Sequence, residues 1–302
     1  MKSIEEQIQE LKKERGAIII AHNYEPDEVQ AIADFTGDSL ELSRKAASLK
    51  EDVVVFCGVH FMAETAAILA PEKTVLIPDA HAGCPMADMI TAEQVQKLKA
   101  EHPGAVVVTY VNSSAAVKAE SDLCCTSSNA AKIIASIPEE KTILFIPDTH
   151  LGHHVQQLLG RKNMVIWDGY CPTHSRIREE EILRAKEEHP NAVMMAHPEC
   201  PSPIRELADE LLSTGQMCAF AQTSSAREFI VATEQGILFR LRNENPNKKF
   251  YAPSPRAICP NMKKIDLEKI LWALQDMRYR VVVPEPECGR ARRAIEAMLE
   301  LS

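Results

Sequence analysis

Residues 17–25 read AIIIAHNYE, and two later stretches repeat the pattern: residues 105–113 read AVVVTYVNS and residues 192–200 read AVMMAHPEC. Each stretch is a short apolar run that ends in polar residues, as expected for a buried strand and the turn that follows it. The second stretch begins 88 residues after the first, and the third begins 87 residues after the second. A period of this length indicates duplicated folding units, so we expect a closed trio of small domains.

The same offsets align four columns of polar or reactive side chains. They carry His22 onto Tyr110 and His197, Tyr24 onto Asn112 and Glu199, and Ser39 onto Ser127 and Thr214, while Cys84, Cys171 and Cys259 follow with spacings of 87 and 88 residues. Four columns in one register are not a chance similarity. The columns therefore define one candidate site that is shared by three units.

Further apolar runs alternate with helical patterns along the chain. We expect strands at residues 17–21, 53–57, 74–77, 105–111, 143–146, 164–167, 192–196, 229–232 and 281–283, and helices at 39–49, 61–69, 130–137 and 289–301. This alternation predicts an α/β fold with parallel sheets and right-handed crossovers. We expect three homologous three-layer αβα domains in a pseudo-threefold arrangement, at residues 1–86, 87–173 and 174–302, the last with a C-terminal closing helix whose host unit the sequence leaves open.

The composition excludes several classes of protein. The chain has 302 residues, of which 45% are hydrophobic, and a net charge of −9 without a basic run. It exceeds the size of a single core, and it lacks the basic surface that nucleic acids require. Without a signal region or an apolar stretch of about 20 residues, we expect a cytoplasmic protein that does not associate with membranes. The absence of a glycine-rich phosphate loop argues against ordinary dinucleotide or NTP binding.

The polar columns lie where parallel sheets bind ligands, beyond the carboxyl ends of the strands. A pseudo-threefold arrangement points these ends at one central cavity. The hydroxyl column (Ser39, Ser127 and Thr214) lies just before helical or loop segments. Such hydroxyls cap helices, and together with the helix N-termini they also bind phosphate or carboxylate. The cavity therefore suits a substrate with several anionic groups.

Each cysteine of the fourth column is followed by proline, in AGCPMAD, GYCPTHS and AICPNMK. Cytoplasmic cysteines rarely form disulfides, and a lone cysteine is usually a small buried apolar residue. Three equivalent cysteines that converge on an axis instead form a trigonal set of thiolates. Such a set holds either zinc with an open fourth position or a 4Fe-4S cluster with one iron that lacks a protein ligand. The spacing alone leaves both possibilities open.

The remaining cysteines and histidines have no such register. His174 follows Cys171 by three residues and is matched by Ala87 and Met262, so we expect it to support the site or to contact substrate. We assign no metal role to Cys57, Cys124, Cys125, Cys200, Cys218 and Cys288. We expect His81, His150, His153 and His154 to be surface or loop residues.

Ten strings between residues 21 and 264 carry a resemblance to a known family: AHNYE, IADFTGDS, FMAE, CPMAD, YVNS, CTSSNA, CPTH, HPECP, STGQM and CPNMKK. Through them the chain resembles quinolinate synthase, the iron-sulfur enzyme of bacterial and archaeal NAD biosynthesis. The resemblance implies a triangular trio of α/β domains around a 4Fe-4S cluster held by Cys84, Cys171 and Cys259. Some family members carry a CxxCxxC segment near the last ligand, whereas this chain has only Cys259 there.

The resemblance also implies the reaction. Family members condense iminoaspartate with dihydroxyacetone phosphate and release phosphate and two waters to give quinolinate. The open iron would act as a Lewis acid during dehydration. An upstream aspartate oxidase or dehydrogenase would supply the iminoaspartate. Two other classes remain as alternatives, a zinc-dependent lyase or hydrolase and a cluster-containing sensor without catalysis.

The resemblance assigns roles to the columns found from the repeat. It implies that substrate is bound by His22, Ser39, Tyr110, Asn112, Ser127, His197, Glu199 and Thr214, to which we add His174. The proton transfers of the reaction need positioned acids and bases, for which we expect Glu199, Tyr24 and His22.

Overall fold

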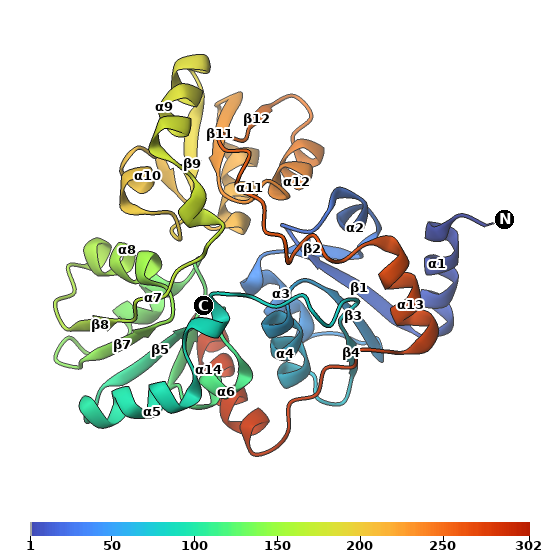
Figure 1. Cartoon of the computed structure of the whole chain (residues 1–302), viewed down its shortest axis with the longest axis horizontal. Coiled ribbons are helices and arrows are strands. Elements are labelled where there is room, and N and C mark those ends of the chain that lie inside the picture. The colour runs from blue at the N-terminus through green and yellow to red at the C-terminus, as the bar shows by residue number, and fades with distance from the viewer. Residues whose placement is uncertain (1) are drawn as a thin grey trace.

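The computed structural model describes residues 2–302 and shows an α/β protein made of three units around a common centre (Figure 1). Each unit has one four-stranded sheet in which neighbouring strands run parallel. Helices flank each sheet. The predicted class, three αβα units with parallel sheets, is confirmed.

The three units have the same order of elements. The first contains α1 (Ile4–Glu14), β1 (Ala17–His22), α2 (Asp27–Ile32), β2 (Phe35–Gly37), α3 (Ser39–Ala46), β3 (Val53–Cys57), α4 (His60–Leu69) and β4 (Thr74–Leu76). The second contains the short helix η1 (Ala87–Met89), α5 (Ala92–Glu101), β5 (Val106–Tyr110), α6 (Ala115–Ala119), β6 (Leu123–Cys125), α7 (Ala130–Ala135), β7 (Ile143–Ile146), α8 (Thr149–Leu159) and β8 (Met164–Ile166). The third contains the short helix η2 (His174–Arg176), α9 (Glu179–Glu188), β9 (Val193–Ala196), α10 (Ser202–Glu206), β10 (Glu210–Leu211), α11 (Thr214–Thr223), β11 (Glu228–Ala232), α12 (Ile237–Glu244) and β12 (Lys249–Tyr251).

The strand order places the first strand of every unit inside its sheet. The orders are β2-β1-β3-β4, β6-β5-β7-β8 and β10-β9-β11-β12. The chain leaves β1 toward one side of the sheet and returns to β3 on the other, and β5 and β9 repeat this arrangement. Such a switch in direction opens a crevice at the carboxyl ends of the two inner strands. Each unit therefore offers one crevice to the centre of the molecule.

An aspartate fixes the same point of the first strand in each unit. The carboxylate of Asp34 accepts the N–H of Ile19 at 2.8 Å, Asp122 accepts that of Val107 at 2.8 Å, and Asp209 accepts that of Met194 at 2.7 Å. A hydrogen bond between a backbone N–H and an ionised carboxylate is stronger than one between neutral groups. These aspartates form a further column of the repeat, which the sequence analysis missed.

The predicted strands differ from the observed ones in two respects. The prediction missed the short strands β2, β6, β10 and β12, which contain two or three residues each. The strand predicted at 281–283 does not form. There the chain makes only an isolated antiparallel bridge between Leu76 and Arg280, and Val282 is 68% exposed.

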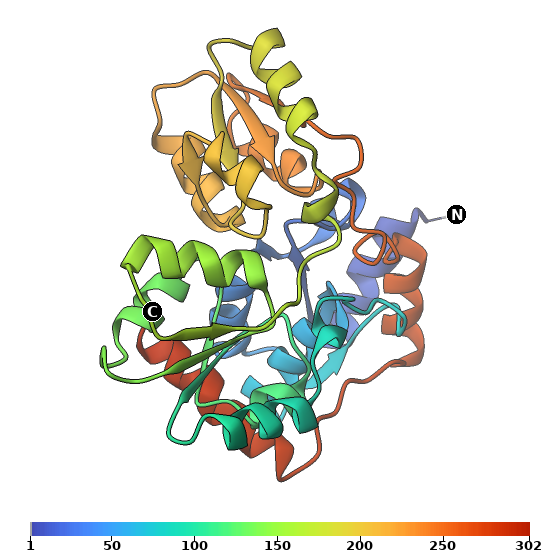
Figure 2. The ribbon, with the colours of Figure 1, turned by 60° about the vertical axis from the view of Figure 1, so that its left-hand side comes forward.

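The C-terminal segment leaves the third unit and returns to the other two (Figure 2). Helix α13 (Leu267–Asp276) packs on α1 of the first unit, and α14 (Glu287–Glu300) packs on α6 and β6 of the second. The sequence predicted the final helix but left open which unit it joins. The segment fastens the first two units together.

The apolar cores likewise join the first two units and leave the third unit separate. One continuous cluster of buried residues includes Ile19 and Phe56 of the first unit, Phe145 of the second and Ile295 of α14. The third unit has separate clusters on the two faces of its own sheet. It contacts the first unit partly through hydrogen bonds, such as the one that the Arg240 guanidinium donates to the Asn23 side chain at 3.0 Å. Within residues 2–302, no helix has the length and apolar character that a membrane crossing requires.

Candidate active site

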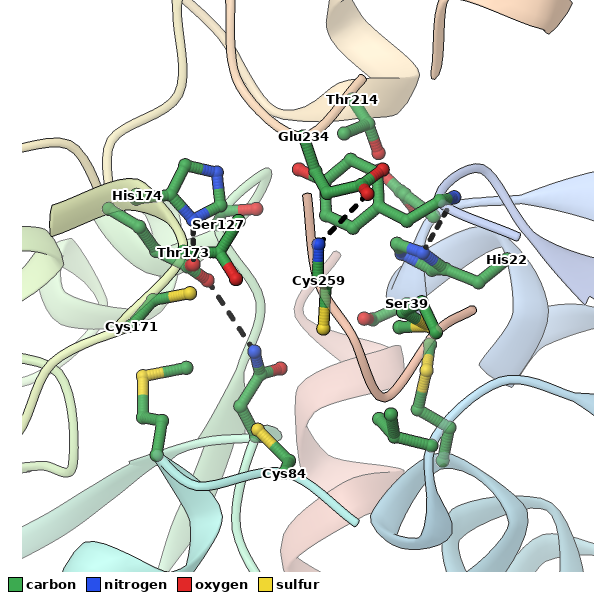
Figure 3. Close-up of a pocket in the computed structure, with 18 of the residues that line it drawn as sticks. His22, Ser39, Cys84, Ser127, Cys171, Thr173, His174, Thr214, Glu234 and Cys259 are labelled. Carbon is green, nitrogen blue, oxygen red and sulfur yellow. Dashed lines mark hydrogen bonds and ion pairs between the residues drawn. The ribbon is translucent and has the colours of Figure 1, made fainter. Parts of the chain in front are cut away.

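The carboxyl ends of the three sheets meet at one cavity of about 70 Å³. Every residue that the sequence predicted for the site lines it: His22, Tyr24, Ser39, Cys84, Tyr110, Asn112, Ser127, Cys171, His174, His197, Glu199, Thr214 and Cys259. Figure 3 shows His22 and His174 on opposite sides of the cavity, with the three cysteines between and below them. Residues that are far apart in the sequence thus meet in one space, as the repeat predicts.

The cysteines lie in the loops that follow the last strand of each unit. Cys84 follows β4, Cys171 follows β8 and Cys259 follows β12, and all three are half-buried free thiols. Figure 3 shows their sulfur atoms directed into the same space. Backbone bonds shape two of the loops, because Asp88 donates its N–H to the Cys84 carbonyl at 3.3 Å and Ser175 donates to the Cys171 carbonyl at 3.0 Å.

The spread of the three sulfur atoms bears on what they hold. In the part of the chain that the structure describes, one set of three possible metal-ligand atoms lies within 4.8 Å of one another, and it consists of Cys171, His174 and Glu199. The three cysteine sulfurs are therefore more widely spread. Thiolates on a single tetrahedral zinc ion would lie roughly 3.8 Å apart, given Zn–S bonds of about 2.3 Å. The cysteine trio fits a group that is larger than one ion.

Burial keeps these thiols protonated when no cation faces them. It raises the pKa of Cys84 to about 12, and it also raises the pKa of Cys171 and Cys259 above the ordinary value. A thiol that ligates a metal must lose its proton, and the charge of the metal ion supplies the driving force. The trio is therefore unsuited to act as free nucleophiles and suited to ligate a positively charged group.

Glu199 is a buried acid that contacts three other side chains of the cavity. Its carboxylate accepts the Tyr110 hydroxyl at 2.5 Å and the Asn112 amide at 3.4 Å, and its other oxygen lies 2.8 Å from Nδ1 of His174. Burial alone would raise the pKa of Glu199, but His174, His197 and Tyr110 together hold it below the usual range of a glutamate. Glu199 is thus a buried, ionised carboxylate at the centre of the site.

Tyrosine hydroxyls surround this carboxylate as proton donors. Burial, reinforced by the charge of Glu199, raises the pKa of Tyr24 and of Tyr110 well above the ordinary value. The Tyr24 hydroxyl lies 2.6 Å from the hydroxyl of Thr233, which in turn lies 2.8 Å from Nε2 of His174. Thr233 thereby joins Tyr24 to the group around Glu199.

The two histidines at the strand ends are neutral donors or acceptors. Burial lowers the pKa of His22 and of His197 to about 3. His197 stacks on His174 with ring centroids 4.9 Å apart, and its Nε2 lies 3.1 Å from the Ser127 hydroxyl. These imidazoles can form hydrogen bonds to a ligand without carrying a charge at neutral pH.

One interpretation of the hydroxyl column was that its members cap helices. The structure shows that they do not. Asp38 caps α3 and a serine caps α11, so that Ser39 and Thr214 are the first residues of these helices. Ser127 likewise does not cap α7, whose N-cap is Asn129. The hydroxyls of Ser39, Ser127 and Thr214 line the cavity instead.

The helix N-termini of two units meet beside the cavity. Ser213, the cap of α11, donates its hydroxyl to Asp38, the cap of α3, at 3.3 Å. A Cβ atom on Gly215 would come within 2.7 Å of the Asp38 carboxylate, so only glycine permits this approach. Asn23 donates its side-chain amide to the Thr214 hydroxyl at 3.0 Å. Each helix N-terminus is thus capped by its own side chain, and the first residues of the helices, Ser39 and Thr214, line the cavity.

The sequence analysis missed Glu234, an acid that supports a cysteine loop. Its buried carboxylate accepts the N–H of Cys259 at 3.0 Å and the N–H of Gly236 at 2.7 Å, and it pairs with Lys263 at 3.0 Å. The Lys263 ammonium also donates to the carbonyl of Tyr24. Glu234 and Lys263 therefore link the Cys259 loop to the end of β1. No column of the repeat contains them, so the period could not have revealed them.

The residues left without a role lie outside the cavity lining. The six other cysteines are buried and free. His81 is exposed in a loop and His153 is exposed on helix α8, as predicted for surface or loop residues, whereas His150 and His154 are half-buried on the same helix.

Comparison with known proteins identifies relatives over nearly the full length. Residues 6–300 match the family described as Quinolinate synthetase A protein. The chain is 52% identical over 302 residues to the quinolinate synthase of Caldicellulosiruptor saccharolyticus, covering 100% of this chain and 99% of the relative. It is 53% identical over 299 residues to that of Dehalococcoides mccartyi and 52% identical over 299 residues to that of Geobacter metallireducens, with 99% of this chain and 98% of each relative covered.

Proposed function

The chain belongs to the quinolinate synthase family, and we propose that this enzyme of NAD biosynthesis condenses iminoaspartate with dihydroxyacetone phosphate to form quinolinate, phosphate and water. One observation carries the proposal: the cavity combines a cysteine from each unit with an ionised glutamate, two protonated tyrosines and two neutral histidines. This combination suits a dehydrating condensation, which needs a metal group and several proton transfers.

We assign the cysteine trio to a 4Fe-4S cluster. Its support is the family membership, together with the wide spread of Cys84, Cys171 and Cys259. Three protein thiolates leave one iron of such a cluster without a protein ligand. When bound, the cluster would supply a Lewis acid at that iron, which favours the departure of hydroxide.

We assign the binding of the anionic groups of the substrates to the hydroxyl column at the start of the helices. Ser39 and Thr214 are the first residues of α3 and α11, and their hydroxyls line the cavity, where they would donate to a phosphate or carboxylate. Ser127 reaches the same cavity beside His197. His22 and His197, both neutral, would complete the binding of oxygen atoms as hydrogen-bond partners.

We assign proton transfer to the group of side chains around Glu199. An ionised carboxylate in a buried cavity is a base, and here it lies beside His174, which can relay a proton. Tyr24 and Tyr110 keep their protons and can serve as acids or as hydrogen-bond donors to a developing negative charge. His22, whose ring centroid is 4.6 Å from that of Tyr24, would assist on the opposite side of the cavity.

An anaerobic assay tests this proposal. The purified enzyme is reconstituted with iron and sulfide and given dihydroxyacetone phosphate, together with iminoaspartate generated in place by an aspartate oxidase or dehydrogenase. We expect quinolinate, detected by chromatography and mass. A protein with a full complement of iron and sulfide that forms no quinolinate contradicts the proposed reaction, and a protein that retains zinc in place of iron supports the zinc-dependent alternative.

A further inference from the structure

Lys118 is a lysine that is buried where the first two units meet. It belongs to α6 of the second unit, which packs on α4 of the first, and it is 0% exposed. Its ammonium donates to the Ser113 carbonyl at 2.5 Å and lies 5.2 Å from the centroid of the Phe61 ring. Phe61 lines the central cavity, whereas Lys118 does not. The ammonium is therefore placed behind the wall of the cavity.

No acid of the described chain pairs directly with this ammonium. Among residues 2–302, no carboxylate oxygen lies within 4.0 Å of its Nζ atom. The carboxylate of Glu64 instead accepts the N–H of Ala115 at 3.0 Å and lies 3.6 Å from Nδ1 of His60. Burial lowers the pKa of Lys118, and the negative charge of Glu64 opposes this effect. A buried cation without a paired anion is costly, so a further negative charge nearby would stabilise the protein.

The other ionisable groups that act on Lys118 are two thiols, those of Cys124 and Cys84. Burial raises the pKa of Cys124 to about 12, so this thiol of β6 is neutral at neutral pH. Cys84 belongs to the cysteine trio, and it also lines a second cavity together with Phe61, on whose ring the ammonium lies. A thiol that ligates a metal gives up its proton. Cys84 therefore brings a negative charge close to Lys118 when the trio holds its metal group.

We propose that Lys118 is the buried counter-charge of the metal group held by the cysteine trio, and that its ammonium raises the reduction potential of that group. This inference rests on the proposed function, in particular on the 4Fe-4S assignment. Three thiolates make the site negative, and one-electron reduction adds a further negative charge. A buried ammonium nearby stabilises the reduced form more than the oxidised form, because charges interact strongly where the dielectric constant is low.

The test is a redox titration of the reconstituted enzyme, with dithionite as the electron donor and with absorbance and electron paramagnetic resonance as the readouts. Lys118→Met keeps an unbranched side chain of similar length and removes the charge. Lys118→Gln also removes the charge but keeps a donor for the Ser113 carbonyl. The iron and sulfide contents of every variant are measured before the titration.

Lys248→Met is the matched control. Lys248 also donates to backbone carbonyls, those of Ala221 at 2.5 Å and Ser224 at 2.6 Å, and lies 5.6 Å from the centroid of the Phe229 ring. It belongs to the third unit and does not line the central cavity. The control therefore removes a lysine with similar contacts at a place away from the cysteine trio.

We expect Lys118→Met to lower the ratio of reduced to oxidised metal group by about tenfold at a given potential, which lowers the midpoint potential of a one-electron couple by about 59 mV. Lys248→Met should leave this ratio within about twofold of wild type, because solvent and salt screen a remote charge. A second measurement follows the unfolding of the apoproteins in denaturant. Since Lys118 has no paired acid, the apoprotein of Lys118→Met should unfold at the same denaturant concentration as wild type or at a higher one.

Three results would overturn the inference. They are a ratio for Lys118→Met within about threefold of wild type at equal iron content, an equal change in Lys248→Met, or Lys118→Met and Lys118→Gln apoproteins that both unfold at a lower denaturant concentration than wild type. A folded Lys118→Met apoprotein that takes up no iron, while Lys248→Met takes it up, supports the inference. If Lys118→Met fails to fold, Lys118→Gln takes its place in the titration.

Failure of this inference can be told apart from failure of the proposed function. A wild-type enzyme that holds zinc in place of iron, or that makes no quinolinate, rejects the proposed function. An active, iron-loaded wild type whose midpoint potential is unchanged by Lys118→Met rejects only the role of Lys118.

Discussion

Replacing Glu199 with glutamine removes one charge from the centre of the site and leaves the shape almost unchanged. Glu199 is 3% exposed. The proposed ligands of the metal group are the three cysteines, so this substitution leaves them in place. The amide oxygen of glutamine can still accept the Tyr110 hydroxyl, which lies 2.5 Å from the carboxylate in the structure. The amide nitrogen, however, would face Nδ1 of His174, a donor, at about the present separation of 2.8 Å.

The contacts of Glu199 set the loss of stability and the loss of turnover that we expect. A hydrogen bond to a charged group contributes about 1.5–3 kcal/mol and one between neutral groups about 0.5–1.5 kcal/mol, and an unpaired buried donor costs about 1–3 kcal/mol. Together the weaker Tyr110 bond and the opposed donors should destabilise the fold by about 2–4 kcal/mol. An amide cannot take up a proton, so the loss of a general base should lower kcat by about 10²–10⁴-fold.

The assay is anaerobic quinolinate formation by enzyme of measured iron and sulfide content. Glu206→Gln is the matched control, because this exposed glutamate of α10 bonds only the hydroxyl of Ser202, at 2.7 Å. We expect Glu199→Gln to retain iron and sulfide and to lose turnover, and Glu206→Gln to retain both. Turnover of the Glu199 variant within about threefold of wild type, at equal iron content, would refute the assignment of Glu199 as the base.

Three further predictions concern the cysteine trio and its surroundings. Cys171→Ala should abolish iron retention, while Cys200→Ala, which removes a buried thiol outside the cavity lining, should keep it; equal iron contents would reject the cluster assignment. Glu234→Gln leaves a lysine without its buried counter-charge, so the free energy of unfolding should fall by about 2–3 kcal/mol in a denaturant titration, and an unchanged midpoint would contradict this. Burial lowers the pKa of His22 and His197 to about 3, so below pH 6.5 the unfolded chain binds these protons more readily than the folded chain; stability should therefore decrease from about pH 6.5 to pH 3, with a shallower slope in the double glutamine variant.

The fold could be predicted because the repeat compensates for weak local signals. Long apolar runs such as those of β1 and β5 predict inner strands, which are buried on both faces. Edge strands such as β10, which has two residues, have no comparable signal, because their pairing depends on the neighbouring strand. The run at 281–283 is apolar but forms no strand. The chain there makes only an isolated bridge at the edge of the first sheet.

The site could be predicted to the extent that the three units resemble one another. Columns of equivalent residues converge because equivalent strand ends converge, whichever side chains they carry. It cannot find a residue that one unit alone provides. Thr233 is such a residue, since its counterpart after β3 is Gly58 and its hydroxyl contacts Tyr24 of the first unit. Contacts of this kind depend on how the units dock, which the sequence does not encode locally.

The docking of three units also explains how an acidic chain would bind the anionic substrates proposed for it. The net charge is −9, and among the described residues that line the cavity none is a lysine or an arginine. Attraction would therefore come from neutral donors, which are the hydroxyl column and two uncharged imidazoles. A single unit offers only one set of these groups. Because the three units place their strand ends around one cavity, several weak anion sites act together beside the ionised Glu199.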